Sequence, residues 1–156
     1  MKGMVVYQSK WGNSRQVAEA VAGGLAEAGH EAEVVAVKSA GSPDPSLDFI
    51  VVGGPTRAAR AYGPIKRFVK GMKGESWKGK RFATFSTGST IATNKPSTQA
   101  SERIYEILEA NGLEPLAPPF KAGVQNMHGP LVGGELERAV EFGRQLGIHM
   151  GSDPLP

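Results

Sequence analysis

The segment YQSKWGNS, residues 7–14, decides the fold because it joins an apolar run to a helical pattern. Before it, Met4 to Tyr7 is an apolar run of strand length. After it, apolar residues recur at helical spacing from Val17 to Ala28, and Gly29 ends the pattern. A strand that leads directly into a helix is the first half of a β-α-β unit.

The same alternation continues along the chain. Apolar runs predict strands at 32–37, 49–52 and 81–85, and a last, proline-interrupted strand at 115–124. Helical periodicity predicts helices at about 64–72, around 104–108, and from about 134 to beyond 146. The run at 49–52 is apolar without alternation, as expected for a strand covered on both faces. We therefore expect one α/β domain over residues 1–150 with helices on both faces of a parallel sheet, and a flexible tail at 151–156.

The composition excludes several classes of protein. The 156 residues include no Cys, so disulfides, thiol nucleophiles and thiolate metal sites are excluded, and any redox chemistry must come from a bound cofactor. The three His residues are scattered, with no metal-ligand spacing, so no metal is expected. No apolar run approaches the length of a membrane span, and no leader pattern is present. These features predict a soluble, cytoplasmic protein that does not bind membranes.

A basic stretch raises the question of nucleic acid. The formal charge is +3, and seven Lys and Arg residues lie between 66 and 81. No nucleic-acid motif accompanies them, so we expect no nucleic-acid partner. A solvated face, an acidic protein partner and an anionic ligand remain open as explanations.

Three polar loops follow predicted strands, at 9–14, 53–63 and 86–93. Ligands of open parallel sheets collect outside the carboxyl ends of the strands. In the first loop Ser9 and Ser14 offer hydroxyls, Gly12 permits a positive φ, and Asn13 can tie the loop together. The free N–H groups at the start of the next helix favour an anion such as phosphate. The alternative is that Asn13 or Ser14 only caps this helix.

Three motifs in this order resemble the flavodoxin-like family over about residues 3 to 148. The first loop, Ser9-Lys10-Trp11-Gly12-Asn13-Ser14, is similar to the family's phosphate loop. The segment 48–57 is similar to the third strand and its flavin loop, and its Pro55-Thr56-Arg57 is closest to the NAD(P)H:quinone oxidoreductase branch. The segment 85–90 is similar to that branch's second flavin loop, through Ser86-Thr87-Gly88-Ser89.

The resemblance implies FMN as the cofactor and a three-layer, doubly wound, five-stranded parallel sheet of order 2-1-3-4-5. It implies that residues 9–14 hold the 5′-phosphate, with the ring system between the loops at Pro55 and Ser86. The resemblance also implies that the Arg57 guanidinium lies near the pyrimidine side of the flavin, where it would favour the negatively charged reduced form. The implied cofactor-binding residues are Ser9, Lys10, Trp11, Gly12, Asn13, Ser14, Pro55, Thr56, Arg57, Ser86, Thr87, Gly88 and Ser89.

Three functions fit these observations. The first is electron transfer by a flavodoxin-like FMN protein that exchanges electrons with partner proteins or with a small-molecule acceptor. The second is an enzyme, an NAD(P)H-dependent FMN quinone reductase. The third is a flavodoxin-fold binding or regulatory module that has lost FMN, since Tyr62 is the one aromatic residue in the two flavin loops. Titration with FMN separates the third from the first two.

Overall fold

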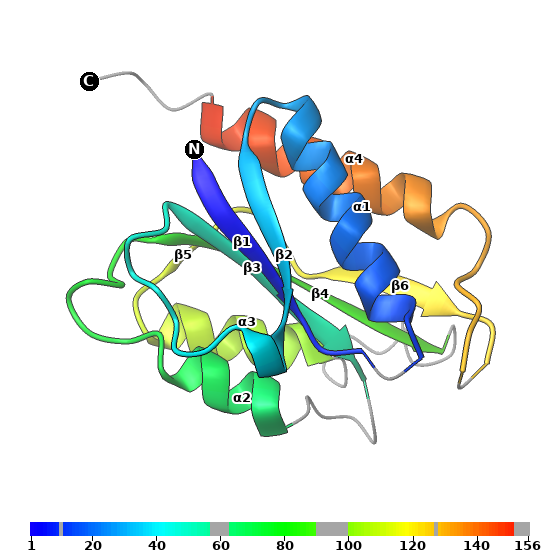
Figure 1. Ribbon diagram of the computed structural model, residues 1–156, viewed down its shortest axis with the longest axis horizontal. Helices are drawn as coiled ribbons and strands as arrows, with labels where there is room; N and C mark the ends of the chain where they lie inside the picture. Colours follow the sequence, from blue (N-terminus) through cyan, green and yellow to red (C-terminus); the bar gives the residue numbers. More distant parts are fainter. Residues whose placement is uncertain (10, 57–62, 90–99, 127, 152–156) are drawn as a thin grey trace.

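The computed structural model describes residues 1–9, 11–56, 63–89, 100–126 and 128–151. Strands and helices alternate along the chain (Figure 1). In chain order the elements are β1 (Lys2–Tyr7), α1 (Asn13–Glu27), β2 (Glu31–Ala36), the 3-10 helix η1 (Val37–Ser39), β3 (Phe49–Pro55), α2 (Gly63–Lys70), β4 (Arg81–Ser89), α3 (Ala100–Ala110), β5 (Glu114–Pro115), β6 (Phe120–Val124) and α4 (Glu135–Gly151).

The strands form one parallel sheet in the order β2-β1-β3-β4-β5. The first part of β4 pairs with β5 and its later part, from Phe85 to Ser89, pairs with β6. Helices α1 and α4 cover one face and helices α2 and α3 cover the other (Figure 1). This arrangement confirms the predicted three-layer α/β fold and strand order. The carboxyl ends of β1, β3 and β4 lie together at one end of the sheet, where ligands are expected.

Strand β3 shows why the apolar runs form the centre of the sheet. Phe49, Ile50, Val51 and Val52 are all at most 1% exposed. Phe49 and Val51 pack on the side of α1 and α4, whereas Ile50 and Val52 pack on the side of α2 and α3. Successive side chains of a strand point to opposite faces, so a strand covered by helices on both sides is apolar at every position.

Helices α1 and α4 are in close backbone contact through two glycines. A Cβ atom added to Gly24 would overlap the carbonyl oxygen of Val140, and one added to Gly143 would overlap the carbonyl oxygen of Val21. Both glycines are buried, whereas the neighbouring Gly23 is exposed. The missing side chains therefore allow the two helices to approach.

The last predicted strand is divided in two. Both β5 and β6 pair with β4, and Pro118 and Pro119 lie between them. Proline has no N–H to donate to the ladder and is found at strand breaks. The prediction of a single strand over 115–124 is thus corrected to two short ones, while the order 2-1-3-4-5 stands.

Two strands extend further than predicted into the polar loops. β4 continues from Phe85 to Ser89, and β3 continues to Pro55. Ser86 to Ser89 pair with residues 121–124 of β6, and Ser86 and Thr87 pair with Gly54 and Pro55 on the other side. The expectation of a loop beginning at Ser86 is therefore wrong, because hydrogen bonding on both sides keeps these polar residues in the sheet.

The chain ends lie partly outside the described residues. α4 runs to Gly151, so the predicted flexible tail falls almost entirely on residues 152–156, which the structure does not describe. Within the described ranges, every helix is too short or too polar to cross a lipid bilayer.

Candidate functional site

The loop between β1 and α1 is shaped by Gly12, which has a φ of 89°. The N–H of Gly12 donates to the Ser9 hydroxyl oxygen at 3.0 Å, and its carbonyl accepts the first helical bond, from Gln16, at 3.0 Å. A positive φ costs glycine nothing and strains most other residues. The predicted tight turn at Gly12 is confirmed.

The N-terminus of α1 has no side-chain cap. Within the described part of the chain, no acceptor is bonded to the amide groups of Asn13, Ser14 or Arg15. The side-chain amide of Asn13 donates instead to the backbone carbonyl of His128, at 3.1 Å. The alternative that Asn13 or Ser14 caps the helix is therefore wrong. Three N–H groups and the positive end of the helix dipole remain for an anion.

Ser14 connects the first loop to the third. Its hydroxyl lies 3.0 Å from that of Thr87 in β4, and the two residues are only 1% and 3% exposed. Each hydroxyl can donate one bond and accept two, so this bond leaves further capacity at both oxygens. The two residues are 73 positions apart in the sequence, and the structure brings their hydroxyls into hydrogen-bond contact.

Thr56, directly after β3, is bonded to both β4 and α3. Its N–H donates to the carbonyl of Thr87 at 2.8 Å, and its hydroxyl accepts a bond from the N–H of Ala100 at 2.9 Å. Thr56 thus serves as a remote cap for α3. Pro55 and Thr56 are both partly exposed at the end of β3.

The remaining predicted residues differ in their surroundings. Ser86 is fully buried, and its hydroxyl lies 2.8 Å from that of Ser101 in α3. Gly88 is buried and Ser89 is exposed. Lys10 and Arg57 lie outside the described residues, so their roles stay predictions. Ser86 supports the start of α3 in this structure, and its predicted contact with the flavin also stays a prediction.

Trp11 and His128 form an aromatic contact beside the phosphate loop. Their ring centroids are 4.4 Å apart at an interplanar angle of 40°. His128 also accepts the bond from Asn13, so the turn after β6 is attached to the first loop by two contacts. Trp11 is therefore placed against its own protein, at the edge of the candidate site.

Gln8 is a site residue that the sequence analysis missed. Its side-chain oxygen is buried and accepts no hydrogen bond from any described residue. Gln8 lines a hollow of about 440 Å³, to whose lining two cations, Arg15 and Lys38, also contribute. Arg15 also donates to Glu19, which raises the pKa of its guanidinium and keeps it charged. The lining residues are Tyr7, Gln8, Ser9, Gly12, Arg15, Ala36, Val37, Lys38 and Pro64.

A signal for Gln8 was present in the sequence. Met4 and Val6 of β1 and Gln8, directly after it, follow the strand alternation, so a polar amide occupies the position after two apolar residues on the same face. A buried acceptor without a donor costs free energy unless a ligand or water supplies one. The hollow is lined by Ser9 and Gly12 of the loop before α1 and by Arg15 of its first turn, so it adjoins the uncapped amides.

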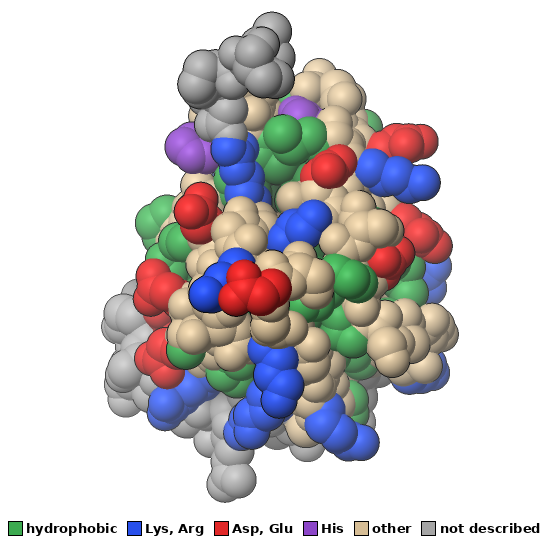
Figure 2. Space-filling model, turned by 90° about the vertical axis from the view of Figure 1, so that its left-hand side faces the viewer, with side chains coloured by type: hydrophobic (Ala, Val, Ile, Leu, Met, Phe, Trp, Pro, Cys, Tyr) green, Lys and Arg blue, Asp and Glu red, His purple; other side chains and the backbone are tan. Residues whose placement is uncertain are grey.

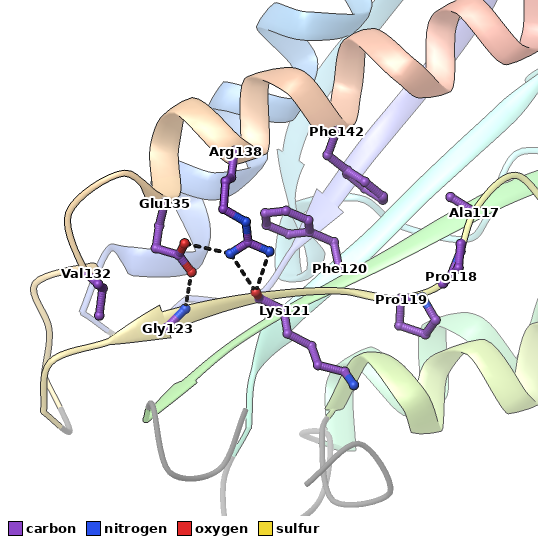
Figure 3. A pocket seen from close by; sticks show the side chains of 10 residues that line it. All are labelled: Ala117, Pro118, Pro119, Phe120, Lys121, Gly123, Val132, Glu135, Arg138 and Phe142. Carbon is purple, nitrogen blue, oxygen red and sulfur yellow. Dashed lines mark hydrogen bonds and ion pairs between the residues drawn. The ribbon is translucent and has the colours of Figure 1, made fainter. Parts of the chain in front are cut away.

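A second pocket, of about 540 Å³, follows the outer edge of β6 (Figure 3). Glu135 of α4 points toward β6, where its carboxylate accepts from the Gly123 N–H and from Arg138, both at 2.6 Å. Arg138 reaches the carbonyl of Lys121 at 3.4 Å and lies over the Phe120 ring. These contacts occupy edge groups that would otherwise pair with another strand, so we interpret them as closing the sheet.

Thr87→Val is expected to lower the free energy of unfolding by about 1–2 kcal/mol, because it leaves the buried Ser14 hydroxyl without this partner. Urea unfolding followed by circular dichroism measures the change. Ser14→Ala in the Thr87→Val background should then cost less than it does alone, since the interaction has already been lost. Strictly additive losses would contradict the coupling between the two loops.

Comparison with known proteins agrees with the observed fold. A protein-family model described as a flavodoxin domain matches residues 4–122. A search of curated proteins finds no match. Solved structures match over the whole domain, at identities that establish a shared fold alone.

Three of these structures show the range. A flavodoxin from the domain Archaea has a TM-score of 0.74 at 19% identity, covering 97% of this chain and 99% of its own. Flavodoxin 1 from Bacillus cereus has a TM-score of 0.75 at 19% identity, with 96% and 99% covered. A flavodoxin, WrbA-like protein from Agrobacterium tumefaciens has a TM-score of 0.70 at 20% identity, with 96% and 98% covered. The family model spans most of the sequence, and the chain therefore belongs to the flavodoxin family.

Proposed function

We propose that this protein binds FMN and transfers electrons between partners. The observation that carries the proposal is the uncapped N-terminus of α1, where three amide groups lack an acceptor among the described residues. A dianionic phosphate fits such a group of donors without a lysine directly on it.

The residues present fit FMN in three respects. The amides of Asn13, Ser14 and Arg15 and the Ser9 hydroxyl would hold the phosphate. The Gln8 oxygen would accept a hydrogen bond from a ribityl hydroxyl. Pro55 and Thr56, with the end of β4, would border the ring system, as the family resemblance implies.

The protein residues bind and orient, and the flavin supplies the one- and two-electron chemistry when it is bound. Lys38, which forms no ion pair among the described residues, adds positive charge to the lining of the hollow and favours an anionic ligand. We propose partner proteins or a small-molecule acceptor as the electron acceptor, and neither nucleic acid nor membrane as a partner.

Titration of the purified protein with FMN, followed by quenching of flavin fluorescence, tests the proposal. We expect saturable binding in the low micromolar range or tighter. Ser9→Ala should weaken FMN binding by about tenfold, the value of one hydrogen bond to a charged group. Ser76→Ala, at an exposed turn before β4, is the matched control and should leave the affinity unchanged. No binding at high micromolar FMN would leave a flavodoxin fold used for recognition.

Quinone reduction is the second candidate, favoured by the Pro55-Thr56-Arg57 sequence at the end of β3. Steady oxidation of NAD(P)H in the presence of a quinone would establish the enzyme. Electron exchange with a protein carrier, without such turnover, would establish the electron-transfer protein.

A further inference from the structure

Charge is distributed unevenly along this chain. Residues 49–101 contain ten Lys and Arg residues and a single acidic residue, Glu75. The rest of the chain contains eight Lys and Arg residues against fourteen Asp and Glu residues. The small formal charge of +3 therefore conceals a strongly basic central segment, which forms β3, α2 and β4.

Part of this segment forms one exposed surface, which we call the α2 basic face. It consists of Lys66, Arg67, Lys70 and Lys73, together with Lys38 of the adjacent η1. Lys66 is partly exposed and the other four are exposed. The opposite side of α2 is buried against the sheet. In Figure 2, Lys and Arg side chains predominate near the bottom of the molecule. This is the height at which α2 lies in Figure 1.

The cations of this face are not neutralised within the protein. Across the described residues, none of the five forms an ion pair with a carboxylate. Helices α1, α3 and α4 differ, because each pairs its arginines with a carboxylate three or four positions away. These pairs are Arg15 with Glu19, Arg103 with Glu106, Arg138 with Glu135 and Arg144 with Glu141.

Three of these cations are neighbours on the surface of α2. Lys66 and Lys70 are four residues apart, and Arg67 and Lys70 are three apart. Like charges at these spacings repel each other on a helix surface. Helix α2 contains no carboxylate that would offset this repulsion, which favours an external anionic partner.

The face adjoins the proposed cofactor site. Lys38 of η1 and Pro64 at the start of α2 line the same hollow as Ser9 and Gly12 of the phosphate loop. A macromolecule seated on the α2 basic face would therefore lie beside the end of the sheet where the cofactor is proposed.

The aromatic residues that the structure describes in the basic segment favour a protein partner over a single-stranded nucleic acid. Phe68, Trp77 and Phe82 are at most 6% exposed and pack in the core. They offer no platform on which bases would stack. The five cations also extend over η1, α2 and the turn after α2, a larger surface than one small anion occupies.

We propose that the α2 basic face docks an acidic electron-carrier protein. The proposal rests on the proposed electron-transfer function and adds the class of partner and the surface that recognises it. Complementary charge brings the two proteins together quickly and orients them, so binding depends on ionic strength.

Binding to an immobilised acidic plant-type [2Fe–2S] ferredoxin tests the proposal, measured with and without FMN. We expect binding at about 0.01 M salt that weakens at least about tenfold at about 0.1 M, as the Debye length falls from about 30 Å to about 10 Å. Arg67→Glu/Lys70→Glu should weaken binding at least about tenfold at low salt.

The matched control is Lys2→Glu/Arg144→Glu, which changes the net charge equally, with Lys2 in β1 and Arg144 in α4 of the opposite layer. It should change the affinity by no more than about threefold. Equal losses in both variants, absence of ferredoxin binding, or tighter binding of a DNA duplex with the same dependence on Arg67 and Lys70 would overturn the proposal. Because ferredoxin binding is measured without flavin as well, a failure of FMN binding is distinguished from a failure of docking.

Discussion

Replacing Gly24 by Ala is expected to lower the free energy of unfolding by about 3 kcal/mol, although alanine is the better helix former. The added methyl group would overlap the Val140 carbonyl, which is backbone and cannot turn aside as a side chain can. Helices α1 and α4 must then separate, which opens the layer of side chains between them and the sheet. Urea unfolding of the two purified proteins measures the difference.

The adjacent Gly23 provides the matched control. It lies in the same helix, is exposed, and would place a Cβ atom with nothing within 4 Å. Gly23→Ala should therefore raise the free energy of unfolding by about 0.5–1 kcal/mol, the ordinary gain in a helix interior. Two neighbouring substitutions of the same kind thus have opposite signs. A stabilising Gly24→Ala would show that the two helices are not held at contact distance.

The largest effect on ligand binding is expected from Gly12→Asp. A side chain at Gly12 meets nothing within 4 Å, and aspartate tolerates a positive φ better than most residues. Its carboxylate would accept bonds from the free amides of α1 and repel a phosphate at the same place. We expect FMN to bind about a hundredfold more weakly, since repulsion of 2–3 kcal/mol is typical of close charges near a protein surface.

Gly12→Asn separates charge from shape. It has the same size and also tolerates a positive φ, so it should weaken FMN binding by about tenfold or less. Riboflavin, which lacks the phosphate, should bind equally to the two variants. The dissociation constants follow from quenching of flavin fluorescence. Equal FMN affinities of the Asp and Asn variants would show that the phosphate does not lie at the start of α1.

The parts of the fold that sequence could predict are those with local signals. The apolar run around residue 50 and the helical spacing after Val17 predicted the layers correctly. A strand buried on both faces is apolar at every position, whereas a helix buried along one stripe is apolar at every third or fourth position, so the two patterns differ. The Gly12 turn was likewise predictable, since glycine next to polar residues is typical of a strand-to-helix turn.

The parts that could not be predicted depend on distant partners. Ser86 and Thr87 resemble a loop by composition, yet hydrogen bonds to Ser101 and Ser14 satisfy their buried hydroxyls within the sheet. The unpaired oxygen of Gln8 depends on the arrangement of neighbouring elements. Propensity describes neither kind of contact, because both join residues from separate parts of the chain.

The contacts of Glu135 and Arg138 with β6 also bear on how the protein behaves at high concentration. An open strand edge invites a second copy to add a strand, which is the first step of aggregation through sheets. On β6 the edge groups of Lys121 and Gly123 are already bonded to α4. At the other margin, β2 carries the exposed carboxylates of Glu31 and Glu33, which repel an identical strand. The bonded edge of β6 and the carboxylates of β2 therefore oppose growth of the sheet at these two strands.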